Sequence, residues 1–303
     1  MTTAIRTEGL SKTFGRTEAL TSLSLEVPER EVIGYLGPNG AGKTTTIRLL
    51  LGLIRASAGR AEIFGVDCQR RPVEAHRRIA YVPGEANLWP SLTGAETLHL
   101  LGRVQGEVDD SYREVLIDRF QLDPTKRVRE YSKGNRQKLI LVAGLMSRAD
   151  LLLLDEPTSG LDPLMEQAFR HCVHEARERG QTVFLSSHIL SEVEALCDRV
   201  AILRSGRLVE VGTLQSIRHL SALSVEAEFD TAPPDLSAVD GVTGVDVQGN
   251  RVRCQVRGSI EPLLGVLAKA GVRHLLSREP SLEVLFLAHY GAPDGASDVT
   301  DAA

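Results

Sequence analysis

The sequence predicts an α/β fold with a mostly parallel sheet, followed by a smaller α+β domain. Short β-rich runs alternate with stretches of helical period in the first two thirds of the chain. These runs lie at 31–37, 78–83, 150–157 and 182–188. Such alternation is typical of parallel sheets covered by helices. A change of pattern near residue 221 places the start of the second domain there.

The stretch between the second and third of these strands differs from the rest of the first domain. From about 92 to 148 the pattern is helical, with amphipathic runs such as ETLHLLGRV and SYREVLIDRF. We therefore expect a helical subdomain inserted between strands of the sheet. The first domain then ends with a strand pair at 201–212, turned at Ser205 and Gly206, and a short helical run to Leu220.

The second domain, 221–290, has the pattern of a small α+β unit. Strands are expected at 224–229, 242–247, 251–258 and 272–277, and helices at 260–271 and 281–290. The last segment, 291–303, is rich in small and acidic residues and is expected to be a disordered tail.

Composition limits the possible partners. The 303 residues are 42% hydrophobic and 25% charged, with a formal net charge of -5, so no basic field is expected to hold nucleic acid. The cysteines are far apart, which fits a reducing compartment. The N-terminus lacks an apolar signal-peptide core, and no apolar run is long enough to span a membrane. We expect any membrane role to come through a partner.

The segment GPNGAGKTT (37–45) matches the phosphate-binding loop pattern between an apolar strand and a helix. Its glycines let backbone N–H groups turn towards phosphate oxygens, and the helix N-terminus adds its positive end. Lys43 would reach the β and γ phosphates, and the Thr44 hydroxyl would bind Mg²⁺. A glycine-rich turn with an accidental lysine is the alternative, which the flanking strand and helix disfavour. The expected ATP-binding residues here are Gly37, Pro38, Asn39, Gly40, Ala41, Gly42, Lys43, Thr44 and Thr45.

Acidic residues follow the buried run LLLL at 151–154, at the strand end where α/β folds bind ligands. Asp155 would hold Mg²⁺, directly or through water. Glu156 would orient the attacking water or accept its proton. An acidic helix N-cap region is the alternative for this pair. His188 ends the next strand and could contact the γ phosphate or the water, so the expected catalytic residues are Lys43, Glu156 and His188.

These motifs, in this order over about the first 215 residues, resemble the ATP-binding subunits of ABC transporters. YSKGNRQK (131–138) is similar to the family's signature, SGLDP (159–163, with Asp162) to the D-loop, and SSH (186–188) to the switch-histidine motif. Phe14 matches the aromatic residue that stacks on adenine. The resemblance implies a P-loop NTPase domain of the ABC type, with an antiparallel β portion beside the parallel-rich sheet.

The resemblance also implies partners and location. In a head-to-tail dimer, a homodimer or a pair with another ATPase subunit, the signature residues Ser132, Gly134 and Asn135 would act in trans on the partner's nucleotide. The implied ligands are ATP and Mg²⁺. Separate integral membrane permease subunits would hold the chain at the cytoplasmic face of the cell membrane. A surface helix cap is the alternative reading of the signature.

This sequence departs from the family pattern at two places. Lys133 replaces the second signature residue, usually glycine, and would point to solvent or add charge beside the nucleotide. Gly84 and Glu85 stand where the Q-loop glutamine is usual; Glu85 could replace it as a metal or water ligand, or be a solvated loop acid. These variants, with PSLEVLFL (280–287), resemble the drug and antibiotic export branch.

The alternatives belong to other classes of function. One is a soluble ABC ATPase that remodels a nucleic-acid or ribosomal complex, although this chain has one cassette and no long coiled coil between the P-loop and the signature. The other is a regulator that binds nucleotide without hydrolysing it, which the changes at Gly84 and Lys133 would permit.

Overall fold

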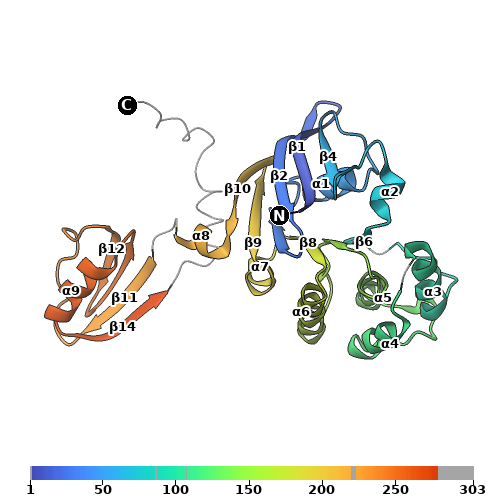
Figure 1. The fold of residues 1–303 in the computed structure, drawn as a ribbon. Coiled ribbons are helices and arrows are strands. Elements are labelled where there is room, and N and C mark those ends of the chain that lie inside the picture. The colour runs from blue at the N-terminus through green and yellow to red at the C-terminus, as the bar shows by residue number, and fades with distance from the viewer. Residues whose placement is uncertain (1, 86, 107, 220–222, 279–303) are drawn as a thin grey trace. The chain divides into compact units, whose positions relative to one another are not determined.

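The computed structural model describes residues 2–85, 87–106, 108–219 and 223–278. The chain divides into two compact units, of which the first ends at Thr213 and the second begins at Leu214. The expected boundary near 221, the expected helix at 281–290 and the expected tail at 291–303 lie outside the described residues (Figure 1).

A largely parallel sheet forms the centre of the first unit. Its strand order is β10-β9-β3-β8-β7-β6, with β10 antiparallel to β9 and the other neighbours parallel. β3, β7 and β8 are buried along their whole length, as expected for parallel strands covered on both faces. The sequence-predicted strands are confirmed, and so is the turn at Ser205 and Gly206. The strands are β3 (Val32–Leu36), β6 (Ile79–Val82), β7 (Leu151–Asp155), β8 (Thr182–Ser187), β9 (Arg199–Arg204) and β10 (Arg207–Thr213).

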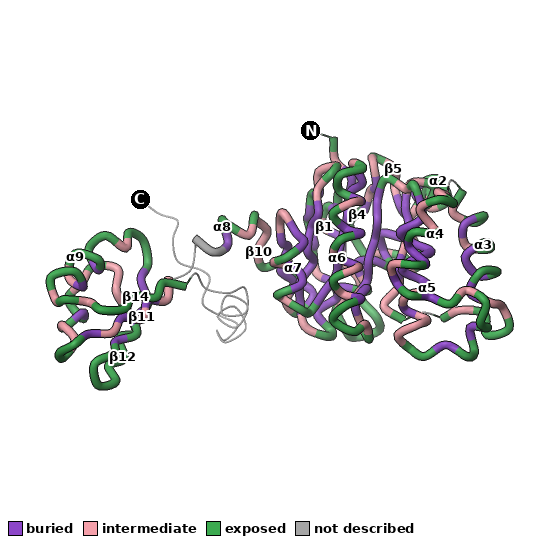
Figure 2. Tube along the Cα trace, turned by 90° about the horizontal axis from the view of Figure 1, so that it is seen from below, coloured by how far each residue is buried: buried purple, intermediate pink, exposed green. Residues whose placement is uncertain are grey.

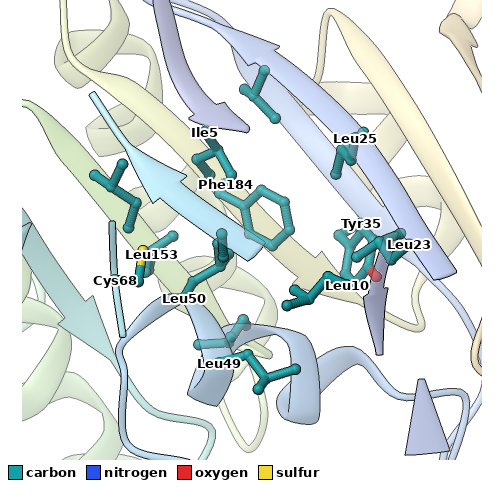
Figure 3. Packing of buried hydrophobic residues seen from close by; sticks show 14 of the residues in the cluster. Ile5, Leu10, Leu23, Leu25, Tyr35, Leu49, Leu50, Cys68, Leu153 and Phe184 are labelled. Atoms are coloured by element: carbon teal, nitrogen blue, oxygen red, sulfur yellow. The ribbon is translucent and has the colours of Figure 1, made fainter. Parts of the chain in front are cut away.

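An antiparallel sheet of order β2-β1-β4-β5 accompanies it. Its strands are β1 (Thr3–Phe14), β2 (Thr17–Pro28), β4 (Ala58–Ile63) and β5 (Val66–Asp67). Their inward side chains and those of α1 (Lys43–Leu50) share a core with the parallel sheet, as Figure 3 shows for Ile5, Leu50 and Phe184. The rings of Tyr35 and Phe184 lie 5.0 Å apart in this core. The core therefore fixes the loop between β3 and α1.

Helices follow β6, as the sequence predicts. α2 (Pro72–His76) precedes β6, and then come α3 (Gly94–Gln105), α4 (Asp110–Arg119), a 3-10 turn (Val128–Glu130) and α5 (Lys133–Leu145) (Figure 1). Side-chain caps begin three of these helices: Thr93 with Glu96 at α3, Asp109 at α4 and Ser132 at α5. α5 packs against β6, where a side chain on Gly144 would collide with Val82.

Two further helices pack on the parallel sheet. α6 (Pro163–Glu178) lies against β8, and α7 (Leu190–Leu196) lies against β3 and β8. The buried face of α6 includes Phe169, Cys172 and Val173. Figure 2 shows how strongly burial is concentrated inside this unit. These packed faces hold the loops that follow β7 and β8 in place.

The second unit is an antiparallel sheet with one helix packed on it. The order is β12-β13-β11-β14, and α9 covers the face that contains Val225, Ala227 and Val252. The other face is polar, with Arg253 paired to Glu226. The elements are α8 (Leu214–His219), β11 (Leu223–Phe229), β12 (Val242–Gln248), β13 (Arg251–Val256), α9 (Glu261–Lys269) and β14 (Val272–Arg278). No helix among the described residues of the chain is long and apolar enough to cross a membrane.

Candidate functional site

The phosphate-binding loop joins the buried strand β3 to α1. Gly40 and Gly42 have φ angles of 83° and 108°, in the left-handed region that favours glycine. A Cβ at Gly37 would lie 2.7 Å from the Leu203 carbonyl oxygen, and one at Gly42 would lie 2.6 Å from that of Ala19. The loop therefore needs glycine at these positions, both for its turn and for its close packing.

Lys43 is the first residue of α1, and its side chain is 5% exposed. Its Nζ donates hydrogen bonds to the carbonyl oxygens of Gly37, at 2.7 Å, and Pro38, at 3.2 Å. The same Nζ lies 3.2 Å from Glu156 Oε1. The lysine thus spans the mouth of the loop and joins it to the end of β7.

Asp155 is the last residue of β7 and is buried. Its Oδ1 accepts a hydrogen bond of 2.5 Å from the Ser186 hydroxyl on β8. Glu156 comes next, with a φ of 47°, a conformation uncommon for a residue with a side chain and often found at functional sites. Its backbone N–H donates to the Ser186 carbonyl at 3.0 Å. β8 therefore fixes the direction of both acids.

His188 follows β8 and is half exposed. Its Nδ1 lies 2.8 Å from Glu156 Oε2. Since Lys43 contacts the other oxygen of the same carboxylate, the structure connects Lys43, Glu156 and His188 through Glu156. It thereby brings together the three residues that the sequence predicts to be catalytic.

Two cavities adjoin these side chains. The smaller, of about 160 Å³, is lined by the loop residues Pro38, Asn39, Gly40 and Lys43 together with Glu156, among others. The larger, of about 560 Å³, extends from Thr44 and Asp155 towards β6. Tyr81 of β6 also lines it, and burial raises the pKa of this phenol to about 12.

The signature residues lie at the start of α5. Ser132 caps this helix, with its Oγ accepting from the Asn135 N–H at 3.2 Å. Gly134 packs against the turn after β7, because a Cβ there would lie 2.9 Å from the Gly160 carbonyl oxygen. Neither Ser132 nor Asn135 is among the described residues that line the two cavities.

Two other predicted site residues also lie away from these cavities. Asp162 is exposed and caps α6, its Oδ1 accepting from the N–H groups of Leu164 and Met165 at 3.1 Å each. Phe14, at the end of β1, is 49% exposed, with the Lys12 ammonium 4.8 Å from the centre of its ring. Among the described residues, Phe14 lines neither cavity.

The two departures from the family pattern meet in the larger cavity. Gly84, Glu85 and Lys133 all line it, beside Asp155 and Glu156. A Cβ on Gly84 would lie 3.0 Å from the Asp155 carbonyl oxygen, so the backbone at Gly84 approaches the end of β7 closely. Lys133 therefore belongs to the wall of this cavity in its own chain.

The structure also identifies residues that the sequence analysis did not single out. Arg48 and Tyr81 line the larger cavity, and Ser186 holds Asp155. Ser186 is part of the SSH segment, so its place in that motif was a usable signal. Arg48 and Tyr81 belong to no recognised motif. They line the cavity because of how α1 and β6 pack, which the sequence does not show.

Comparisons with known proteins show which family this chain is similar to. The family described as ABC transporter matches residues 20–159. The bacitracin transport ATP-binding protein BcrA of Bacillus licheniformis is 40% identical over 69% of this chain and 70% of its own length. The daunorubicin resistance ATP-binding protein DrrA3 of Streptomyces coeruleorubidus is 35% identical over 94% of this chain and 95% of its own.

Solved structures give the same result for the fold. A structure described as the ATP-binding subunit of an ABC transporter matches with a TM-score of 0.67 and 31% identity, over 72% of this chain and 92% of that one. Since DrrA3 is 35% identical over nearly the whole of both chains, the chain belongs to the ABC transporter family, as an ATP-binding subunit with ATPase activity.

Proposed function

We propose that this subunit hydrolyses ATP·Mg²⁺ to power the export of a drug, an antibiotic or another amphipathic compound through separately encoded membrane subunits. The observation that carries the hydrolytic part is the contact of Glu156 with both Lys43 and His188. These groups lie where the phosphate loop, the end of β7 and the end of β8 converge. The remaining steps follow from what each group can donate or accept.

Binding of ATP begins at the loop. Backbone N–H groups at the start of α1 and the Lys43 ammonium would receive the β and γ phosphates. Lys43 now contacts Glu156, so phosphate oxygens would replace that carboxylate as its partner. ATP binding would thereby release one oxygen of Glu156 for the reaction.

The site also suits a magnesium ion. The Thr44 hydroxyl and the Asp155 carboxylate line one cavity, and hard oxygen donors of this kind are what Mg²⁺ prefers. When bound, the ion would neutralise phosphate charge as it develops. The hydrogen bond from Ser186 to Asp155 Oδ1 leaves the other carboxylate oxygen of Asp155 for this task.

Hydrolysis would then use the carboxylate that ATP has freed. Glu156 would accept a hydrogen bond from water and orient it in line with the γ phosphorus. As the water oxygen bonds to phosphorus, the bond to the β–γ bridging oxygen breaks, and ADP leaves with that electron pair. His188 would hold Glu156 in place through its 2.8 Å contact and stabilise charge at the γ phosphate.

The relatives support a transport function over the alternatives. The name of BcrA specifies bacitracin transport, and that of DrrA3 specifies daunorubicin resistance. The match to DrrA3 covers 94% of this chain, so it includes part of the second unit as well as the ATPase domain. A nucleic-acid remodeller or a regulator without turnover is not favoured by relatives of these descriptions.

The role of Glu156 gives the first prediction. Glu156→Gln should bind ATP with affinity similar to the wild type, because the P-loop is intact, but should release phosphate at least about 100-fold more slowly, since an amide is a poor proton acceptor. Phosphate release and ATP binding by the purified full chain are the measurements. Glu178→Gln, an exposed carboxylate on α6, is the matched control and should stay fully active.

The same variant should accumulate as an ATP-bound dimer on size-exclusion chromatography, because the closed state is not reset by hydrolysis. Near-normal phosphate release by Glu156→Gln would overturn the assigned role. For the transport part, the tagged chain purified from detergent-solubilised membranes should bring with it a polytopic membrane protein. Recovery with ribosomes or nucleic acid instead would favour the remodelling alternative.

A further inference from the structure

Glu192 is a buried acid close to the candidate catalytic residues, and the mechanism above does not use it. It lies on α7, four positions after His188, with 3% of its surface exposed. A carboxylate is seldom buried to this extent unless it has a partner. Its contacts therefore indicate what it does.

One partner is the Ser187 hydroxyl, which donates to Glu192 Oε2 at 2.6 Å. The same hydroxyl accepts a hydrogen bond from the Ile189 N–H at 2.9 Å. Ser187 is itself 2% exposed. These bonds close a ring around the turn that contains His188, so the carboxylate fixes the backbone on both sides of the histidine.

The second oxygen of the Glu192 carboxylate lacks the hydrogen bond that the first one has. Glu192 Oε1 is buried and has no hydrogen-bond partner among the described residues. A buried acceptor without a partner costs about 1–3 kcal/mol, so its retention requires a compensating role. Burial raises the pKa of Glu192, and the hydrogen bond from Ser187 opposes part of this shift.

We propose that Glu192 is a positioning residue for His188: through Ser187 it holds the histidine turn at the distance where His188 Nδ1 meets Glu156. This inference deepens the proposed catalytic role of His188 and rests on it. A displacement of about 1 Å at a reacting group can cost about 100-fold in rate, so a support of this kind has a measurable effect.

Graded variants of the full chain test the idea. Glu192→Met keeps the length of the side chain but removes both acceptors, and kcat for phosphate release should fall about 10-fold with an unchanged KM for ATP. Glu192→Gln keeps an acceptor for Ser187 and should restore kcat to within about 3-fold of the wild type. Ser187→Ala removes the same hydrogen bond and should lower kcat as much as Glu192→Met. It replaces Glu192→Met in the test if that variant does not fold. Glu178→Met, which changes an exposed carboxylate on α6, is the matched control and should keep the wild-type rate.

A double-mutant cycle separates positioning from a general loss of stability. If Glu192 acts through His188, Glu192→Met should cost no further rate in a His188→Ala background. The imidazole NMR signals of His188, identified by their loss in His188→Ala, should shift in Glu192→Met and stay in place in Glu192→Gln. An additive loss in the cycle, or imidazole signals unmoved by Glu192→Met, would overturn the inference. Wild-type activity of His188→Ala would instead refute the catalytic role of His188. The NMR result would still show whether Glu192 positions the His188 ring.

Discussion

At the scale of single residues, Lys133 and Gly84 are the two departures from the family pattern, and both line the larger cavity. Lys133 brings a cation, and the backbone of Gly84 lies close to Asp155. Lys133 makes no ion pair within 4.0 Å in the part of the chain that the structure describes, although Asp155 and Glu156 line the same cavity. An unpaired ammonium near a phosphate site attracts the additional charge of ATP relative to ADP.

Lys133→Ala should therefore weaken binding of ATP more than binding of ADP. Because the side chain is exposed, we expect a change of about 2- to 5-fold in the Kd for ATP. Isothermal titration of both nucleotides makes the measurement, at a protein concentration where size-exclusion chromatography gives a monomer. Lys126→Ala removes a surface lysine paired with Asp123 at 3.6 Å, and neither affinity should change. Equal weakening of ATP and ADP by Lys133→Ala would contradict an effect on the γ phosphate.

At the scale of elements, two helices are joined by a cluster of polar side chains. Arg119 at the end of α4 donates to Glu175 of α6 through both terminal nitrogens, at 2.8 and 2.9 Å. The Tyr112 hydroxyl donates to the same carboxylate at 2.5 Å. These bonds connect the helices after β6 to the sheet-packed helix α6. Since α5 carries the signature beside α4, the cluster helps to set where Ser132 lies relative to the sheet.

This cluster predicts a pH dependence. The hydrogen bonds from Arg119 lower the pKa of Glu175 to about 2, from an ordinary value of 4.5. The ionised form is therefore favoured by folding, and its contribution is complete above about pH 4.5 and is lost as the pH falls towards 2. Glu175→Gln should destabilise the chain by about 2 kcal/mol at pH 7.

Urea unfolding of the wild type and Glu175→Gln between pH 7 and pH 3 tests this sign. The difference between their free energies of unfolding should shrink as the pH falls below about 4.5. Glu178→Gln, three residues along the same helix on its exposed side, should match the wild type throughout. A difference that grew on acidification would contradict the assigned cause.

The sequence predicts those elements whose pattern is local. β3, β7 and β8 are apolar runs that end in polar motifs, so both the strands and the meeting of Lys43, Glu156 and His188 could be expected. The links through Ser187 and Glu192, or through Arg119 and Glu175, could not. These hydrogen bonds join residues on different elements. Which residues meet depends on how the helices pack, and hydrophobic periodicity does not predict that packing. For the same reason the sequence did not supply the order β12-β13-β11-β14.

At the scale of the whole molecule, the signature serine and the phosphate loop of one chain do not share a cavity among the described residues, although Lys133 of the signature lines the larger one with Asn39 and Thr44. Within the described part of the chain, Ser132 lines neither the loop cavity nor the larger one. Ser132 and Asn39, at the tip of the loop, are both exposed. Exposed anion-binding groups that are not joined in one cavity suit a head-to-tail dimer, because each chain would then complete the site of the other.

Cysteine cross-linking tests this assembly, since Cys68, Cys172, Cys197 and Cys254 are all buried and should react slowly. In a Glu156→Gln background, a chain with Asn39→Cys is mixed with a chain carrying Ser132→Cys. With ATP·Mg²⁺ and a mild oxidant, a disulfide-linked heterodimer should form, because a disulfide requires Cα atoms within about 7 Å. ADP should not support it, and Asn39→Cys alone should give no dimer, since two copies of one loop would not face each other. Efficient cross-linking of Asn39→Cys to itself would instead place loop against loop and exclude the head-to-tail arrangement.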